Sequence, residues 1–221
     1  MRTFFLKNSN YITFTILLVI LITVKIINPS FVKSISYLSF DVYQKIFSEK
    51  KETDVVIVDI DEKSLGKFGQ FPWNRNVFAK ILDQLNNSDP KAIGFDIFFT
   101  EKDKQSPDAI IKSYNLIPSD VSELQNLKGP DQVFSEKLKE SESVIAVLGR
   151  NVPSHSNYDR KAKARFLSKG GDPKNFSYSY PHSIGSLEIL EKNVKGLGSI
   201  SFLDQLDGII RSLPMIVRFD N

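Results

Sequence analysis

The residues best suited to chemistry in this chain are three aspartates at two apolar segments. Asp59 and Asp61 come directly after the β-branched residues 55–58, and Asp96 lies within the apolar residues 92–99. Both segments predict strands buried on both faces, as in a helix-covered sheet. Ligands usually bind such sheets at the carboxyl ends of the strands, so these acids could hold a polar ligand or a divalent metal. Because clustered carboxylates repel, internal pairing with Arg75 or Arg211, or helix capping, is the favoured interpretation.

Asp59 and Asp61 also permit a hydrolase hypothesis. One carboxylate would act as the nucleophile and the other as the acid on a phosphoester. An Asp-x-Asp after a strand is a weak motif alone, and no convincing downstream lysine and acidic pair completes such a site. A metal-dependent phosphohydrolase is therefore the alternative, and no catalytic residue is predicted.

Two arginines complete the candidate site. Arg75 and the only tryptophan, Trp73, share a Pro-Trp-Asn-Arg turn at the start of a predicted helix. An aromatic ring beside a guanidinium could line a pocket for an anionic ligand, although pairing within the fold is the commoner use. Arg211 follows the turn Asp207–Gly208 and could pair with Asp207 or point into the same pocket. The candidate ligand-binding residues are Asp59, Asp61, Trp73, Arg75, Asp96, Asp207 and Arg211.

Composition narrows the function classes. The 221 residues suffice for one extramembrane domain and a membrane anchor. The charge of +3, from 29 basic and 26 acidic residues, is spread without a basic block, so nucleic-acid binding is not predicted. The absence of cysteine excludes disulfides, thiolate nucleophiles and cysteine-based zinc sites. His155 and His182 have no partner at a ligand spacing, and we predict neither a metal nor a cofactor.

The N-terminal region contains a candidate membrane anchor. Residues 11–24 are uncharged and mostly apolar, and Ile26 and Ile27 extend this stretch past Lys25 to a length just adequate for a bilayer. We predict one transmembrane helix over residues 11–27, since no small-residue cleavage pattern of a signal peptide follows. The tail of residues 1–10 is predicted to be cytoplasmic and the remainder to lie outside the inner membrane, as a single-pass protein.

Helices and strands alternate after this anchor. An amphipathic helix over residues 29–47, within a connecting segment of residues 28–52, could be a dimer seam or pack on the following domain. The pattern predicts an α/β domain over residues 53–221, with a helix-covered mixed sheet that is mostly parallel and ends in an antiparallel hairpin around Asp207–Gly208. Further helices are predicted at residues 77–85, 133–141 and 187–193, and strands at 55–58, 92–99, 144–148, 196–202 and 215–219. Residues 102–129 are predicted to leave the sheet, and residues 151–174 to form a loop.

Four segments follow one another in the order VVIVDIDEKSLGKFGQFPWNRNVFAKILDQL, KAIGFDIFF, VIAVLG and GLGSISFLDQLDGIIRSLPMIVR. In this order they resemble the type 2 CHASE domain, an extracytoplasmic sensory module of bacterial receptors. The resemblance covers residues 31–219, and it is the order of the motifs that is specific. The matching positions are Asp59, Asp61, Ser64, Leu65, Pro72, Trp73, Arg75, Gly94, Asp96, Asp207, Gly208, Arg211 and Pro214.

The resemblance implies a membrane-anchored sensor of a small polar ligand or a stress signal. Typical members continue into further transmembrane helices and a cytoplasmic adenylate or guanylate cyclase or a protein kinase. This chain ends at Asn221, so we expect a fragment of a receptor or an isolated sensor. Residues 102–129 and 151–174 look longer than the family core. A homodimer, and an anchored dimerisation or scaffold module, are the remaining alternatives; the family does not identify a ligand.

Overall fold

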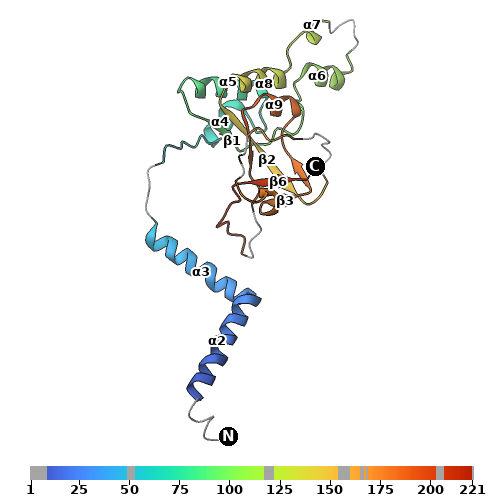
Figure 1. Cartoon of the computed structure of the whole chain (residues 1–221). Helices are drawn as coiled ribbons and strands as arrows, with labels where there is room; N and C mark the ends of the chain where they lie inside the picture. Colours follow the sequence, from blue (N-terminus) through green and yellow to red (C-terminus); the bar gives the residue numbers. More distant parts are fainter. Residues whose placement is uncertain are drawn as a thin grey trace. The chain divides into compact units, whose positions relative to one another are not determined.

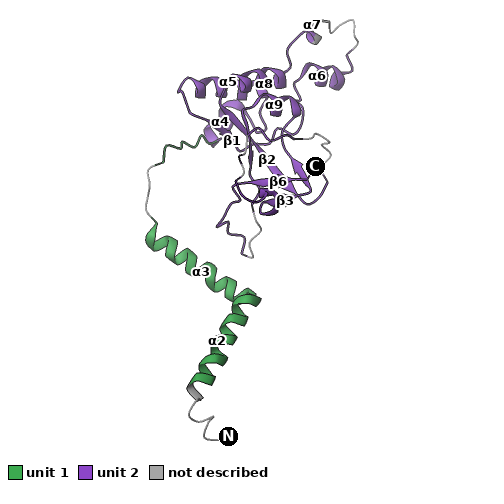
Figure 2. Ribbon diagram, viewed as in Figure 1, with its two compact units in different colours: residues 1–59 green, residues 60–221 purple. Residues whose placement is uncertain are grey.

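The computed structural model describes residues 9–48, 53–116, 122–153, 160–164, 167, 169–202 and 207–220. The chain divides into two units, residues 1–59 and residues 60–221 (Figure 2). The second unit contains all of the strands that the structure describes. The fold class of the α/β domain therefore rests on this unit.

Two helices form most of the first unit. Helix α2 (Ser9–Ile27) ends before Asn28, which has a left-handed φ of 46°, and α3 (Ser30–Phe47) begins after Pro29. Among the described residues, no single helix is both long and apolar enough to cross a membrane. Helices α2 and α3 meet that requirement only together, as a pair bent by 84°. The predicted transmembrane helix over residues 11–27 is thus not confirmed.

Residues 55–58 are not a strand, and here the sequence prediction is wrong. Their side chains are between 64% and 87% exposed. A strand is stabilised by backbone hydrogen bonds to a neighbouring strand, and none of the described strands pairs with this segment. The β-branched run indicates a preference for extended, buried surroundings but does not supply a pairing partner.

A mixed sheet of four strands centres on β2 (Ser143–Arg150). Strands β1 (Ile93–Phe95) and β5 (Gly196–Ser199) flank its first half, and both run parallel to it. Strand β4 (His182–Ile184) pairs with the last residues of β2 in the antiparallel sense. Figure 1 shows β1 beside β2. The predicted α/β fold with a mixed sheet is confirmed.

The predicted antiparallel hairpin at the end of the chain is not formed. Strand β6 (Val217–Phe219) instead pairs in parallel with β3 (Tyr178–Tyr180), as a separate two-stranded sheet. The Asp207–Gly208 turn exists, with a φ of 72° at Gly208. Residues 200–216, however, separate β5 from β6, whereas hairpin loops usually have about 2–5 residues.

Helices α5 (Arg75–Asn86), α8 (Pro130–Lys139) and α9 (Glu188–Asn193) build the core against β1 and β2 (Figure 1). Apolar residues four apart share one face of a helix, so α5 and α8 each present an apolar stripe. The Phe99 ring lies 5.0 Å from that of Phe78 and 5.2 Å from that of Phe134. The buried residues of α5, α8 and α9 in this cluster are Phe78, Ala79, Leu82, Phe134, Leu138 and Leu190. The three predicted helices of the domain are confirmed.

Short helices fill the less periodic segments. Helix α4 (Glu62–Phe68) precedes the core helices, and α6 (Pro107–Tyr114) and α7 (Ser122–Gln125) occupy the predicted excursion from the sheet. The 3₁₀ helix η2 (Pro173–Asn175) lies at the end of the predicted loop.

Candidate functional site

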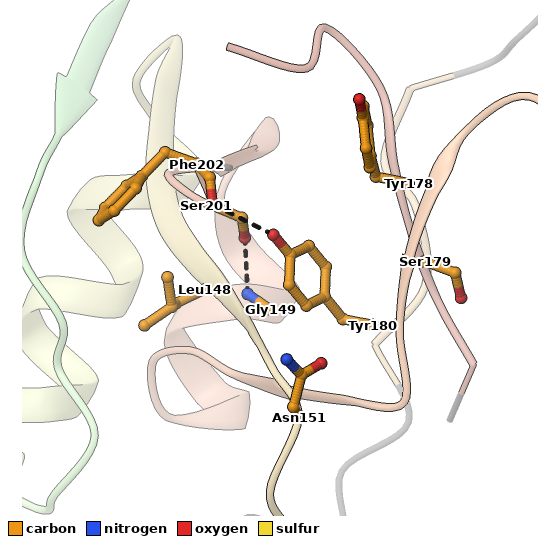
Figure 3. Close-up of a pocket in the computed structure, with 8 residues that line it drawn as sticks. All are labelled: Leu148, Gly149, Asn151, Tyr178, Ser179, Tyr180, Ser201 and Phe202. Carbon is orange, nitrogen blue, oxygen red and sulfur yellow. Dashed lines mark hydrogen bonds between the residues drawn. The ribbon is translucent and has the colours of Figure 1, made fainter. Parts of the chain in front are cut away.

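A cavity of about 400 Å³ lies where β2 and β5 end. The two strands are parallel, so their carboxyl ends meet at one edge of the sheet, where ligands of α/β proteins commonly bind. The volume falls within the range of about 300–1,000 Å³ that is usual for small-molecule sites. We call this cavity the strand-end pocket; Leu148, Gly149, Asn151, Tyr178, Ser179, Tyr180, Ser201 and Phe202 line it (Figure 3).

Tyr180 is held directly against β2. A Cβ atom at Gly149 would overlap the Tyr180 ring, so this close approach requires glycine. The Tyr180 hydroxyl donates a hydrogen bond to the carbonyl oxygen of Phe202 at 3.3 Å. The ring therefore bridges β2 and the segment after β5, and its hydroxyl group is already engaged (Figure 3).

Ser201 also connects β2 to the segment after β5. Its buried Oγ accepts hydrogen bonds from the backbone N–H of Gly149 at 2.7 Å and from the Ser199 hydroxyl at 3.0 Å. These bonds fix the spacing between the ends of β2 and β5. Ser201 thus builds the wall of the strand-end pocket, and its oxygen is committed to that role.

Asn151 and Tyr178 carry the polar side-chain groups of the pocket that are unpaired within the described part of the chain. Neither side chain hydrogen-bonds to another of the residues that the structure describes, and Tyr178 is 49% exposed. Tyr178 and Tyr180 are two positions apart on β3, so they lie on one face of that strand. Figure 3 shows the intervening Ser179 side chain pointing away from Tyr180.

None of the lining residues is charged. The adjacent carboxylate, Asp220, accepts a hydrogen bond from the Ser179 hydroxyl and pairs with Arg218 at 2.8 Å between Nε and Oδ1. The Ser179 hydrogen bond and then the Arg218 charge lower the pKa of Asp220. This carboxylate is therefore ionised at neutral pH and already neutralised by its own partners.

Trp73 and Arg75, both sequence candidates, lie side by side but are buried, with exposed fractions of 5% and 8%. The Trp73 indole donates to the carbonyl oxygen of Gly69 at 2.7 Å. The Arg75 guanidinium lies 4.6 Å from the centre of the Phe99 ring and donates to the carbonyl oxygen of Glu101 at 3.1 Å. The predicted neighbourhood of an aromatic ring and a cation exists, as part of the core.

Two aspartates that the sequence analysis did not select complete this buried region. Arg75 Nε lies 3.5 Å from Oδ1 of Asp131, and the Arg75 backbone N–H donates to Oδ2 of Asp103 at 2.6 Å. Asp103 N–H in turn donates to Oδ2 of Asp131 at 2.9 Å. Burial raises the pKa of Asp131. We call Arg75, Asp103 and Asp131 the buried ionic network. The sequence signal that could have pointed to Asp131 is its position after Pro130, at the start of a helix.

The three aspartates that head the sequence prediction are placed differently from one another. Asp61 caps α4, with its Oδ1 accepting hydrogen bonds from the Ser64 hydroxyl at 2.7 Å and the Ser64 backbone N–H at 2.9 Å. These two bonds lower the pKa of Asp61 and confirm the predicted capping. Asp59 and Asp96 are exposed. Within the described ranges, no three acidic or histidine side chains converge to hold a metal ion.

Asp207 and Arg211 form the internal pair that was one of the predicted uses. Two guanidinium nitrogens of Arg211 lie 3.0 Å and 2.7 Å from the carboxylate oxygens of Asp207. This bidentate contact lowers the pKa of Asp207 to about 2. Ligand binding by the seven sequence candidates stays a prediction.

Comparison with protein-family models identifies the class. The CHASE2 domain model matches residues 14–220, nearly the whole chain. The chain belongs to the CHASE2 family, a family of sensory domains. No curated protein matches the chain, and no solved structure does.

Proposed function

We propose that this chain is the extracytoplasmic sensory part of a bacterial membrane receptor and that its signal binds in the strand-end pocket. The observation that carries the proposal is the CHASE2 match over residues 14–220, together with a ligand-sized cavity at the carboxyl ends of parallel strands. The chain itself is not catalytic in this proposal. A cyclase or protein kinase in the intact receptor would supply the output.

The segment around α2 is the proposed membrane anchor. Residues 11–24 are uncharged, and the large apolar side chains of residues 16–22 are between 45% and 58% exposed in the structure. Apolar surface of this extent is unfavourable in water and favourable in lipid. Lys25, close to the end of the helix, can reach the interface with its charged end.

Single-cysteine reporters test the proposed topology cleanly because the chain contains no cysteine. Lys91→Cys introduces a thiol at an exposed position of the second unit, and Asn8→Cys introduces one in the predicted tail. In intact cells, a membrane-impermeant maleimide should label the first variant, and it should label the second only after the cells are broken. The reverse pattern would refute an extracytoplasmic sensor.

Ligand sensing is tested on the full chain in lipid nanodiscs. A panel of small metabolites is screened for those that raise the unfolding temperature, since a ligand that binds only the folded state stabilises it. Each stabilising compound is then tested on Asn151→Trp, which fills the strand-end pocket, and on Asn126→Trp as an exposed control. The proposal fails if every stabilisation survives Asn151→Trp.

Dimerisation through α3 is the second candidate function. The stripe predicted along this helix is exposed in the structure, and its members are Phe31, Ile35, Leu38, Val42 and Ile46. Their spacings of three and four residues suit the seam of a two-stranded coil. Leu38→Cys on this stripe should then form an intermolecular disulfide in nanodiscs, whereas Gln44→Cys on another face should not. Equal crosslinking of both variants would exclude the seam.

A further inference from the structure

We propose that the strand-end pocket binds an uncharged ring that carries several hydroxyl groups, of the kind a neutral monosaccharide presents. This inference rests on the proposed function, because it assigns a ligand class to the same pocket. It is drawn from three properties of the lining: its lack of charge, two polar side chains without partners among the described residues, and two tyrosine side chains from one strand.

The lack of charge in the lining argues against an ionic ligand. A charged group that leaves water without meeting an opposite charge carries a large desolvation cost. Three arginines of the domain are already paired, Arg75 with Asp131, Arg211 with Asp207 and Arg218 with Asp220. Arg150, between Gly149 and Asn151 in the chain, is not among the residues that line the pocket. An acid, a phosphate or an amino-acid zwitterion would therefore find no matching charge in this lining.

The polar groups of Asn151 and Tyr178 suit a ligand that carries several hydroxyl groups. The Asn151 amide offers both a donor and an acceptor, and the Tyr178 hydroxyl can act as either. The hydroxyls of a sugar ring also donate and accept, so different hydroxyls of one ring can satisfy these two side chains. An apolar ligand would leave the Asn151 amide without a partner, which costs free energy if the group is desolvated.

The aromatic rings supply the non-polar half of the site. Tyr178 and Tyr180 lie on one face of β3, and the Tyr180 ring is fixed by its hydroxyl bond to Phe202 and by its contact with Gly149. A pyranose has one face that presents mainly C–H groups, which can pack on an aromatic ring while its hydroxyls remain available for hydrogen bonds. The Tyr180 ring, which is already fixed, loses little conformational entropy when such a ligand binds.

The probes for the test are glucose, galactose, mannose and N-acetylglucosamine, with glucuronate and glucosamine as charged counterparts. Binding to the full chain in nanodiscs is measured by isothermal titration calorimetry. We expect at least one neutral probe to bind more tightly than both charged ones. Failure of all four neutral probes to bind, or tighter binding of a charged probe, would overturn the proposal.

Variants locate the bound probe. Asn151→Ala and Tyr178→Phe each remove one hydrogen-bonding group and should weaken binding about fivefold. Tyr178→Ala also removes the ring and should weaken it further. The exposed controls Asn126→Ala and Tyr114→Ala should bind as the wild type does. Unchanged affinity in both Asn151→Ala and Tyr178→Ala would overturn the assignment.

The ligand class and the proposed function can fail separately. If an ionic metabolite stabilises the chain and Asn151→Trp abolishes that effect, the strand-end pocket is a sensory site but the neutral-sugar inference is wrong. If neutral sugars bind and Asn151→Trp leaves their affinity unchanged, both the pocket assignment and the inference fail.

Discussion

The buried ionic network and the strand-end pocket are both rich in polar groups, yet those groups are used in opposite ways. In the network, Arg75 and Asp103 are almost fully buried and bind other parts of the same fold. In the pocket, Asn151 and Tyr178 are uncharged, and their polar groups are without partners among the described residues. In the network the charged groups are bound within the fold, whereas in the pocket the two neutral groups are the ones that we propose meet a ligand.

Removing the charge of Arg75 should have the largest effect. Arg75→Met keeps an unbranched apolar stem beside Phe99 but leaves Asp131 buried without its cation. Breaking a buried pair in this way typically costs about 3–5 kcal/mol of stability. Urea denaturation of the full chain would measure the loss. The exposed Lys80→Met on the same helix should change stability by less than about 0.5 kcal/mol; similar losses for both variants would remove the distinction between the two regions.

A methyl group at Gly149 should have the next largest effect. Gly149→Ala would force the Tyr180 ring away from β2, and overpacking of this kind usually costs about 1–3 kcal/mol. Binding in the strand-end pocket should weaken as well. Gly66→Ala is the matched control, because a Cβ at that position would meet no atom within 4 Å beyond its chain neighbours and the backbone of its own helix. Thermal unfolding that gives equal values for both variants would show that Tyr180 is not held as described.

A second buried ion pair should make the stability of the domain depend on pH. Glu191 lies 2.9 Å from Arg160, with both side chains at most 3% exposed, and burial raises the pKa of Glu191. A carboxyl group with a raised pKa in the folded state stabilises the fold below its unfolded pKa, and this contribution is lost as the pH rises through the folded pKa. The wild type should therefore lose stability relative to Glu191→Gln as the pH increases above about 4.5.

Asp207 should show the opposite dependence. Its pKa is lowered to about 2, so its stabilising contribution is present above the unfolded value of 3.8 and is lost as the pH falls toward 2. Urea titrations of the wild type, Glu191→Gln and Asp207→Asn between pH 2 and pH 8 would separate the two signs. A stability difference with the same pH slope for both variants would contradict the two assignments.

Asn151→Ala and Tyr178→Phe should have the smallest effect on stability. Neither change removes a hydrogen bond between described residues, so the free energy of unfolding should stay within about 0.5 kcal/mol of the wild type. The same variants should weaken ligand binding, which sharpens the contrast with Arg75→Met. A loss of stability as large as that of Arg75→Met would mean that these side chains also support the fold.

Local sequence patterns predicted the features that depend on nearby residues. The helical period of residues 77–85 corresponds to α5, the Asp61 cap lies three residues from Ser64, and Asp207 is four residues from Arg211. Each of these features depends on residues that are close to one another in the sequence. They could therefore be predicted without knowledge of the tertiary structure.

Features that join distant segments were not predictable in the same way. The strand-end pocket combines residues 148–151, 178–180 and 201–202, and no local pattern indicates that they meet. Pairing of β6 with β3 likewise depends on where the intervening chain runs. Residues 55–58 give the converse case. Their sequence has a strong strand pattern, yet the segment is exposed and unpaired within the described structure.

Hydrogen–deuterium exchange of the full chain in nanodiscs, with and without a neutral monosaccharide that binds, tests the central claim most directly. If the sugar binds in the strand-end pocket, exchange should slow at residues 148–151 and 178–180, and also at residues 217–219, because β6 is hydrogen-bonded to β3. Exchange around Arg75, Asp103 and Asp131 should not change. Protection at the buried ionic network, with none at the strand-end pocket, would show that the ligand does not bind in this pocket.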